Sequence, residues 1–155
     1  MAYTRRITLE EGARVPLDAL LLGWGAMVPL AVSALLAWWP EAGAVAVEAG
    51  RLWAAAIAVF LSGVRRGLSF RTEGGPRWSQ LAMMVWLFFG GIAAVVMPLS
   101  WGLALLLALY LSLAVLDPVA ARAGEAPLYF ARLRPAQMGV GVVCLGVMAV
   151  AVWGA

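Results

Sequence analysis

The chain has 155 residues, of which 65% are hydrophobic and 12% are charged, and its mean hydropathy is +0.94. Roughly a quarter of the residues in a soluble domain are charged, so this composition predicts an integral membrane protein. The chain contains no histidine, no lysine and one cysteine, Cys144. Haem and zinc sites with imidazole ligands, and catalysis by serine–histidine or cysteine–histidine pairs, therefore lack an essential side chain. We expect no catalytic residue, no metal site and no cofactor in a protein that is not an enzyme.

Five apolar stretches are long enough to cross a bilayer core about 30 Å thick, which takes about 20 helical residues. Pro16 stands where a helix start is favoured, and Asp117-Pro118 is expected to end the fourth stretch. The predicted fold is an all-α integral membrane protein with an N-terminal arm at 1–15 and one five-helix domain at 16–155. Its transmembrane helices are predicted at about 17–39, 44–68, 77–97, 98–116 and 135–153.

The first stretch also has an interpretation as a secretory signal, because arginines precede it and Ala44-Val45-Ala46 resembles a cleavage site. The apolar core of a signal has about 7 to 15 residues. The run from Leu17 to Trp39 is longer than that, so we predict a transmembrane helix.

The arginines predict how the helices are oriented. The N-terminal arm and the connections after the second and fourth helices contain ten of the eleven arginines, and Arg51 alone falls on the other side. The positive-inside rule then places the N-terminus in the cytoplasm and the C-terminus in the periplasm of a bacterial inner membrane. Tryptophans agree, since Trp38 and Trp101 mark outer helix ends and Trp78 an inner one. Because topology accounts for the arginines, we expect no nucleic-acid partner.

Glu48 and Arg51, near the start of the second predicted helix, are three residues apart and share one face of it. In one interpretation both side chains extend to water at the outer interface. In the other they form an ion pair that holds this helix against a neighbour or a partner subunit. We favour the first interpretation, and the second stays open.

The densest cluster of notable residues lies at the end of the second predicted helix. Gly63 and Gly67 are four residues apart, a spacing that lets two helix backbones approach closely. Arg65 and Arg66 are predicted to stop the helix at the cytoplasmic surface and to contact anionic lipid head groups. Alternatively, one of them is buried and binds carboxylates or backbone carbonyls of other helices. The candidate carboxylates are Asp117 and Glu73.

Further residues are predicted to pack helices or to contact lipid or a partner protein. Pro29 should kink the first helix because it removes a backbone donor. Gly90 and Gly91 indicate another close helix contact, whereas Trp24 and Trp86 fall inside spans and are predicted to be packing residues. The remaining arginines predicted to contact head groups or a partner are Arg71, Arg77, Arg132 and Arg134, the last two within 127–134, a segment expected in the head-group layer.

Three stretches resemble a known family. They are 60–67 (FLSGVRRG), 27–29 (MVP) and the late pattern of Leu116-Asp117, Leu128-Tyr129 and Leu133-Arg134. Over about 16–153 the chain resembles the domain-of-unknown-function family thirty-four twenty-nine, small bacterial membrane proteins with a mitochondrial inner-membrane relative. The family pattern has glycine at the position of Ser62 and tryptophan at that of Arg66. The resemblance implies a small multi-span inner-membrane protein and implies no activity.

No ionisable residue falls in the middle of a predicted span, where pumps and proton-coupled carriers place them. We therefore predict a non-enzymatic accessory or assembly subunit that packs against a larger respiratory or photosynthetic complex and contacts anionic lipids of the bilayer. The alternative is a small oligomeric channel or carrier. Its pathway would have to use Ser33, Ser62, Ser100, Tyr110, Ser112 and Gln137. A third class, an enzyme acting on lipid or quinone, would need Glu73, Asp117 and Glu125, whose spacing matches no catalytic pattern.

Overall fold

The computed structural model describes residues 15–72 and 74–154. In this part of the chain the helices are α1 (Leu17–Gly25), α2 (Val28–Leu36), α3 (Gly43–Ser69), α4 (Trp78–Val96), α5 (Leu99–Arg122) and α6 (Phe130–Trp153). α1 and α2 form one crossing, so the described residues contain five helical stretches long and apolar enough to span a membrane. This confirms the predicted all-α, multi-pass membrane fold. The predicted N-terminal arm at 1–15 lies outside the described residues, apart from Val15.

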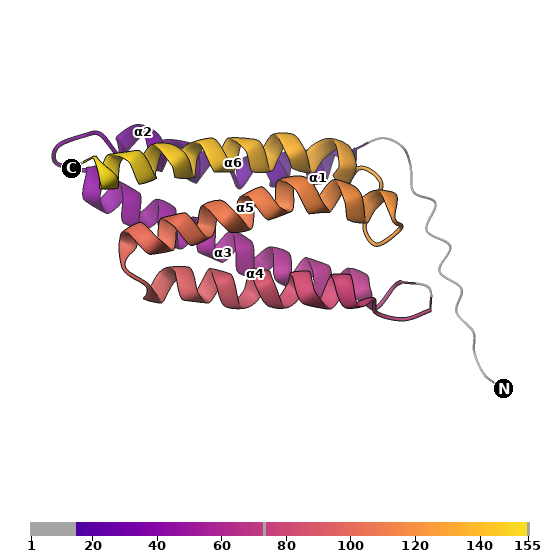
Figure 1. Cartoon of the computed structure of the whole chain (residues 1–155). Coiled ribbons are helices and arrows are strands. Elements are labelled where there is room, and N and C mark those ends of the chain that lie inside the picture. The colour runs from indigo at the N-terminus through magenta and orange to yellow at the C-terminus, as the bar shows by residue number, and fades with distance from the viewer. Residues whose placement is uncertain (1–14, 73, 155) are drawn as a thin grey trace.

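The crossings lie side by side in an elongated bundle, and α1 begins at the end opposite the end of α6 (Figure 1). α3 is the central helix, because it contacts α2, α4, α5 and α6. The largest fully buried apolar side chains are Leu30, Leu87, Leu103, Leu106, Leu109, Leu113, Met138, Leu145 and Met148. α1 differs from the others in burying none of its residues. One wall of the bundle is therefore loosely packed.

The first crossing is interrupted near the predicted kink. The helix breaks at Ala26 and Met27, and Pro29 is the second residue of α2, where its missing N–H has no intrahelical partner to lose. The indole Nε1 of Trp53 donates a hydrogen bond of 2.8 Å to the carbonyl of Ala26. A side chain of α3 thus supplies a donor to the backbone exposed by the break.

Two predicted helix boundaries are wrong. Asp117-Pro118 does not end the fourth span, because α5 continues to Arg122 with Pro118 inside it. The fifth span does not begin at Pro135, because α6 begins at Phe130. The cause is tertiary packing, since Phe130 packs with Ala120 and Ala121 in a small buried cluster. Residues 130–134 of the 127–134 segment are therefore helical and join the bundle, and the place of the segment in the head-group layer stays a prediction.

The predicted packing glycines fall into two classes. A Cβ added at Gly90 would lie 2.8 Å from Cδ2 of Leu109, and one added at Gly91 would lie 3.1 Å from the carbonyl oxygen of Ala55. These two glycines therefore allow α4 to approach α5 and α3. A Cβ at Gly63 or Gly67 would meet no atom within 4 Å, so this pair packs against no other described helix of the chain.

Candidate functional site

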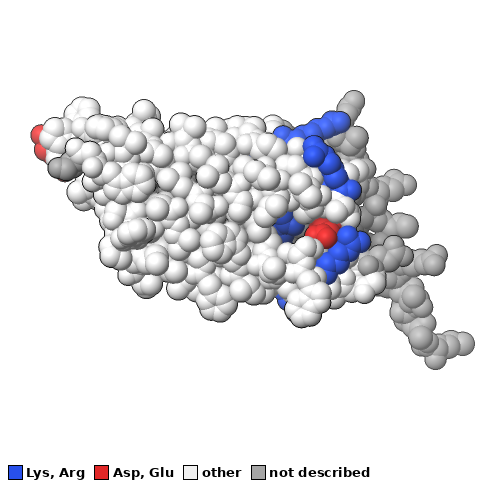
Figure 2. Space-filling view, in the orientation of Figure 1, with Lys and Arg blue, Asp and Glu red and all other residues white. Residues whose placement is uncertain are grey.

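The charged side chains lie mainly at the two ends of the bundle. On the face drawn in Figure 2, blue side chains gather where α3 and α5 finish, and a red one projects at the opposite end. We call the first end the arginine-rich end. Among the described residues it carries Arg65, Arg66, Arg71, Arg77, Arg122, Arg132 and Arg134. The opposite end carries Arg51, Glu48 and Glu41.

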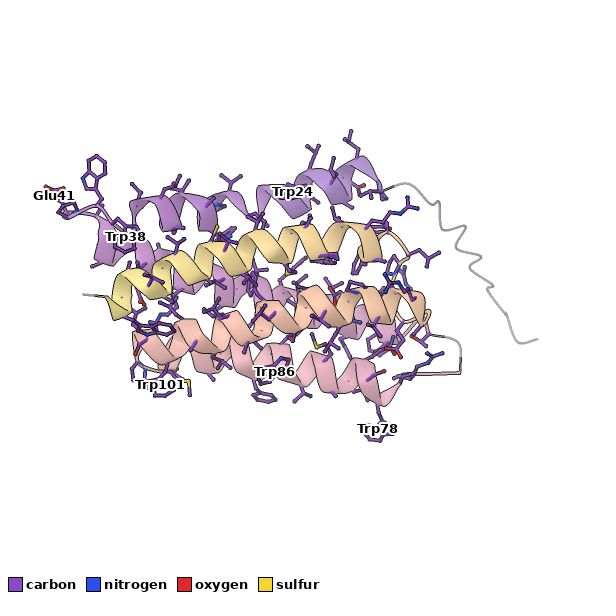
Figure 3. The ribbon with its side chains drawn as sticks, turned by 45° about the horizontal axis from the view of Figure 1, so that its top comes forward. Trp24, Trp38, Glu41, Trp78, Trp86 and Trp101 are labelled. Atoms are coloured by element: carbon purple, nitrogen blue, oxygen red, sulfur yellow. The ribbon has the colours of Figure 1, made fainter. Side chains whose placement is uncertain are left out.

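Tryptophans mark the same two ends. Trp78 projects at the arginine-rich end, and Trp38 and Trp101 lie at the opposite end (Figure 3). Trp24 and Trp86 lie between the ends, and both are more than a third exposed on the bundle surface. Both lie within spans as predicted, and Nε1 of Trp86 donates to the hydroxyl of Ser112 on α5 at 3.1 Å. Such a distribution is typical of a helix bundle surrounded by lipid.

A cluster of ionised side chains joins α3, α5 and α6 near the arginine-rich end. Nη2 of Arg65 donates to Oδ1 of Asp117, and the two side chains are only 4% and 2% exposed. Nε of Arg134 lies 3.4 Å from Oδ2 of the same carboxylate. The guanidinium of Arg134 also lies 4.5 Å from the ring centroid of Phe130. We call Arg65, Asp117 and Arg134 the buried triad.

The buried triad decides between the two interpretations of Arg65. Its side chain is enclosed and paired with Asp117, so the prediction of head-group contact is wrong for Arg65. Glu73, the other candidate carboxylate, lies outside the described residues. Arg66 points elsewhere, because consecutive helical residues are about 100° apart. It lies over the ring of Phe70, 4.1 Å from the centroid.

The other arginines that were predicted to contact head groups differ in their exposure. Arg71 and Arg132 have exposed side chains at the arginine-rich end, where their contact with anionic lipid or a partner stays a prediction. Arg134, which was placed in the same group, is drawn into the buried triad instead. Its spacing from Phe130 was the available clue, since residues four apart on a helix share a face.

Arg51 forms a second buried contact at the opposite end. Nη2 donates to Oε1 of Glu48 at 2.5 Å, and Nη1 donates to the carbonyls of Ala94 at 3.3 Å and Met97 at 3.0 Å. Pro98 has no N–H, so the carbonyl of Ala94 lacks its helical donor four residues on. Arg51 replaces that donor and ties α3 to the turn between α4 and α5. The Glu48–Arg51 pair is thus present, and Arg51 does not extend to water.

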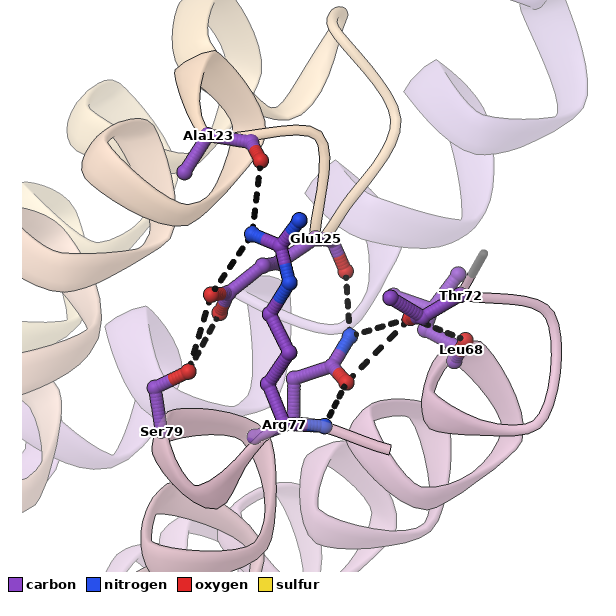
Figure 4. Close-up of polar contacts among 7 residues, drawn as sticks. Leu68, Thr72, Arg77, Ser79, Ala123 and Glu125 are labelled. Atoms are coloured by element: carbon purple, nitrogen blue, oxygen red, sulfur yellow. Dashed lines mark hydrogen bonds and ion pairs between the residues drawn. The ribbon is translucent and has the colours of Figure 1, made fainter. Parts of the chain in front are cut away.

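Figure 4 shows a polar network that ties the α3–α4 connection to the α5–α6 connection. Nη1 of Arg77 donates to the carbonyl of Ala123 at 3.1 Å, and the hydroxyl of Ser79 donates to the carboxylate of Glu125 at 2.8 Å. The buried Gln80 donates to the carbonyl of Glu125 at 3.1 Å and accepts from the N–H of Arg77 at 3.1 Å. Gln80 was not predicted, although a glutamine three residues after a helix cap is a capping position.

An apolar cavity of about 490 Å³ lies between α1, α3 and α6. Its walls are formed by side chains such as Leu22, Ile57 and Leu61, and its polar groups include Arg134 and Gln137. Gln137 is only 1% exposed, and its Nε2 has no hydrogen-bond partner among the described residues. Nε of Arg134 has no hydrogen bond there either, but it lies 3.4 Å from Oδ2 of Asp117. Buried polar groups are nearly always hydrogen-bonded, so the unpartnered amide of Gln137 beside a cavity is unusual.

The outer surface of α3 forms a continuous exposed face. Ala56, Phe60, Gly63 and Gly67 are all exposed, and their spacing of three and four residues places them on one side of the helix. We call these four residues the α3 face. A groove of about 570 Å³ between α3 and α4 runs along it and is lined in part by Ala56 and Phe60. The face therefore combines a protruding ring, small residues and a bordering hollow.

No family model matches the chain, and no curated protein or solved structure matches it either. The resemblance carried by 60–67 therefore stays a prediction. Among residues 15–72 and 74–154, no group of three or more histidine, cysteine, aspartate or glutamate side chains is placed to hold a metal ion. Cys144 is a buried free thiol. The features from which function can be argued are the buried triad, the Arg51 contact, the cavity and the α3 face.

Proposed function

We propose that the chain is a non-enzymatic accessory subunit that packs through the α3 face against a partner protein in a larger membrane complex. The observation that carries this proposal is the outward position of Gly63 and Gly67, which meet no other helix of the described chain. Helices associate in lipid mainly through small residues that let backbones approach closely. A glycine also lowers helix stability by about 1 kcal/mol relative to alanine. Because Gly63 and Gly67 contact no other described helix of the chain, they favour packing against a helix of another protein.

The charged contacts support a structural role rather than catalysis. Arg65 is bound to Asp117, Arg51 to Glu48 and two carbonyls, and Arg77 to Glu125 and Ala123. Each contact joins different helices or connections, apart from the Glu48–Arg51 pair within α3. The side chains that an enzyme at this end would need are thus engaged in holding the bundle together.

The orientation and location belong to the same proposal. The arginine-rich end lies in the cytoplasm, so the N-terminus is cytoplasmic, the C-terminus is periplasmic and the membrane is a bacterial inner membrane. The exposed Arg71 and Arg132 at this end support that orientation, because anionic lipid attracts them. Cysteine labelling from either side of intact cells, at substituted positions in the two sets of connections, tests it.

The channel alternative receives little support. The hydroxyls of Ser62 and Ser112 donate to the carbonyls of Val59 and Leu109 within their own helices. The hydroxyl of Tyr110 is fully buried and donates to the carbonyl of Ala54 at 3.2 Å. Polar groups engaged in this way within a single chain do not line a water-filled path. A channel would have to form between several copies.

Copurification from native membranes in a mild detergent tests the accessory-subunit proposal. We expect the tagged protein to bring down one stoichiometric membrane partner, identified by mass spectrometry. The double variant Gly63→Leu/Gly67→Leu should lose this partner yet fold normally, because both positions face open space.

Gly139→Leu is the matched control, since Gly139 on α6 also meets no atom within 4 Å of an added Cβ. It should retain the partner. If the wild-type protein runs alone, or if the double variant keeps the partner as well as the control does, the proposal is wrong.

A further inference from the structure

The α1/α3/α6 cavity has an amphipathic lining. Its walls are hydrocarbon, from side chains such as Leu22, Ile57 and Leu61, and Arg134 and Gln137 provide donor groups on α6. Its volume of about 490 Å³ falls in the range of about 300 to 1,000 Å³ found for ligand sites. Such a lining fits a molecule with an apolar chain and a polar head better than a wholly apolar or a wholly polar molecule.

Two donor side chains that line the cavity lie close together on α6. Gln137 follows Arg134 by three residues, so both side chains lie on one face of the helix. Nε2 of Gln137 has no hydrogen-bond partner among the described residues, and the guanidinium of Arg134 pairs through Nε, 3.4 Å away, with Oδ2 of Asp117. Both groups donate, and donors require an acceptor such as a carboxylate or phosphate oxygen. The ligand head must therefore present oxygen acceptors.

The net charge of the buried triad indicates that the head group of the ligand is negatively charged. Arg65 and Arg134 bring two positive charges to one carboxylate, that of Asp117. An excess positive charge is costly among buried side chains unless an anion or water offsets it. A negatively charged head beside Arg134 balances the cluster, whereas an uncharged head leaves it positive.

Among the walls of the cavity, α1 would gain the most apolar contact from a bound ligand. α1 buries none of its residues within the chain. A Cβ added at Gly23 would lie 2.1 Å from Nε2 of Gln137, so only glycine lets this amide lie against α1. A hydrocarbon chain in the cavity would give α1 the apolar contacts that the rest of the chain does not provide.

We propose that the α1/α3/α6 cavity binds an anionic amphiphile, whose hydrocarbon chain lies among the apolar walls and whose head-group oxygens accept from Arg134 and Gln137. The chemistry is that of a fatty-acid carboxylate or of an acidic phospholipid. This site adjoins the proposed partner contact, because Ala56 and Phe60 of the α3 face also line the cavity, whereas Gly63 and Gly67 do not.

Native mass spectrometry of the purified full chain, in a non-ionic detergent, tests the proposal with four probes. These are oleate, oleyl alcohol, dioleoylphosphatidylglycerol and dioleoylphosphatidylcholine. We expect at least one anionic probe to bind about tenfold more tightly than its uncharged or zwitterionic counterpart, as charged hydrogen bonds provide. Preference for oleate identifies a fatty acid, and preference for phosphatidylglycerol identifies a bilayer lipid.

Variants locate the binding. Ala19→Phe fills the cavity from α1 and should abolish binding of the preferred probe, while Val143→Phe, at an exposed position outside the cavity, should not. Gln137→Leu removes one donor at similar volume and should weaken binding about fivefold. Thermal unfolding of each variant verifies that it is folded.

Equal affinity for both members of each probe pair overturns the proposal, and so does unchanged binding to folded Ala19→Phe. Both measurements use the isolated chain. Their result is therefore independent of whether a protein partner is found at the α3 face.

Discussion

The two buried arginines of α3 differ in how their charges are balanced. Arg51 binds one carboxylate, that of Glu48, and two backbone carbonyls, so the charges around it sum to zero. Arg65 shares the carboxylate of Asp117 with Arg134, so two positive charges meet one negative charge. Arg51 thus donates hydrogen bonds to backbone carbonyls at one end of α3, whereas Arg65 belongs to a positively charged cluster at the other end.

The two ends also differ in whether the charges of their buried arginines are balanced within the chain. At Arg51, Nη1 and Nη2 bind partners within the chain and replace the donor that Pro98 cannot provide, and Nε alone of this guanidinium has no hydrogen bond among the described residues. The buried triad keeps an excess positive charge, and Nε2 of the neighbouring Gln137 has no hydrogen bond among the described residues. The contact at Arg51 therefore has a structural role, and the end that contains the buried triad is the one suited to bind an anion.

The largest expected effect is that of Asp117→Asn. It leaves two enclosed guanidiniums without a counter-charge, and breaking a buried ion pair in this way costs about 3 to 5 kcal/mol. We expect a loss of that size in the free energy of unfolding, measured by SDS titration in bicelles. Asp18→Asn, at an exposed position on α1, is the control. A loss no greater than that of the control would contradict the role given to the triad.

The next largest effect is expected for Arg51→Met. It leaves the carbonyls of Ala94 and Met97 without the Arg51 donor, which should cost about 2 to 3 kcal/mol. Arg51→Lys keeps the charge but not the forked geometry, so its loss should be intermediate. The same titration measures both. If lysine and methionine were equivalent, the hydrogen bonds to the carbonyls would not be what Arg51 provides.

A smaller effect is expected for Gly102→Ala, beside the Arg51 contact. A Cβ there would lie 2.3 Å from the carbonyl oxygen of Ala94, so the turn between α4 and α5 must open, at about 1 to 3 kcal/mol. Gly63→Ala meets no atom and should instead stabilise by up to about 1 kcal/mol. Changes of the same sign in the two variants would refute the division of the glycines into two classes.

The smallest effect is expected for Glu48→Gln. The Glu48 side chain is 43% exposed, and water screens its attraction to Arg51, so we expect a loss below about 1 kcal/mol. Compared with Asp117→Asn, this variant isolates the influence of burial on a carboxylate that pairs with arginine. Comparable losses in the two variants would show that burial does not distinguish the two ends.

The sequence predicted the elements that depend on local composition, and missed those that depend on packing. Apolar length alone identified the five crossings, and three-residue spacing identified the Glu48–Arg51 pair as one option. The extension of α5 past Pro118 depends on Phe130, which is distant in sequence. The burial of Arg65 needed three helices to meet, and the outward direction of Gly63 depends on how α3 is rotated in the bundle. Neither is encoded in a local pattern.

The proposed function depends most on whether the α3 face contacts a partner protein rather than lipid. Site-specific photo-crosslinking in native membranes tests it most directly, with benzoylphenylalanine at Phe60 of the α3 face or at Phe89 of α4, which are 69% and 62% exposed. We expect one protein adduct of defined mass from position 60 and only lipid adducts from position 89. Lipid adducts alone from both positions would contradict the claim.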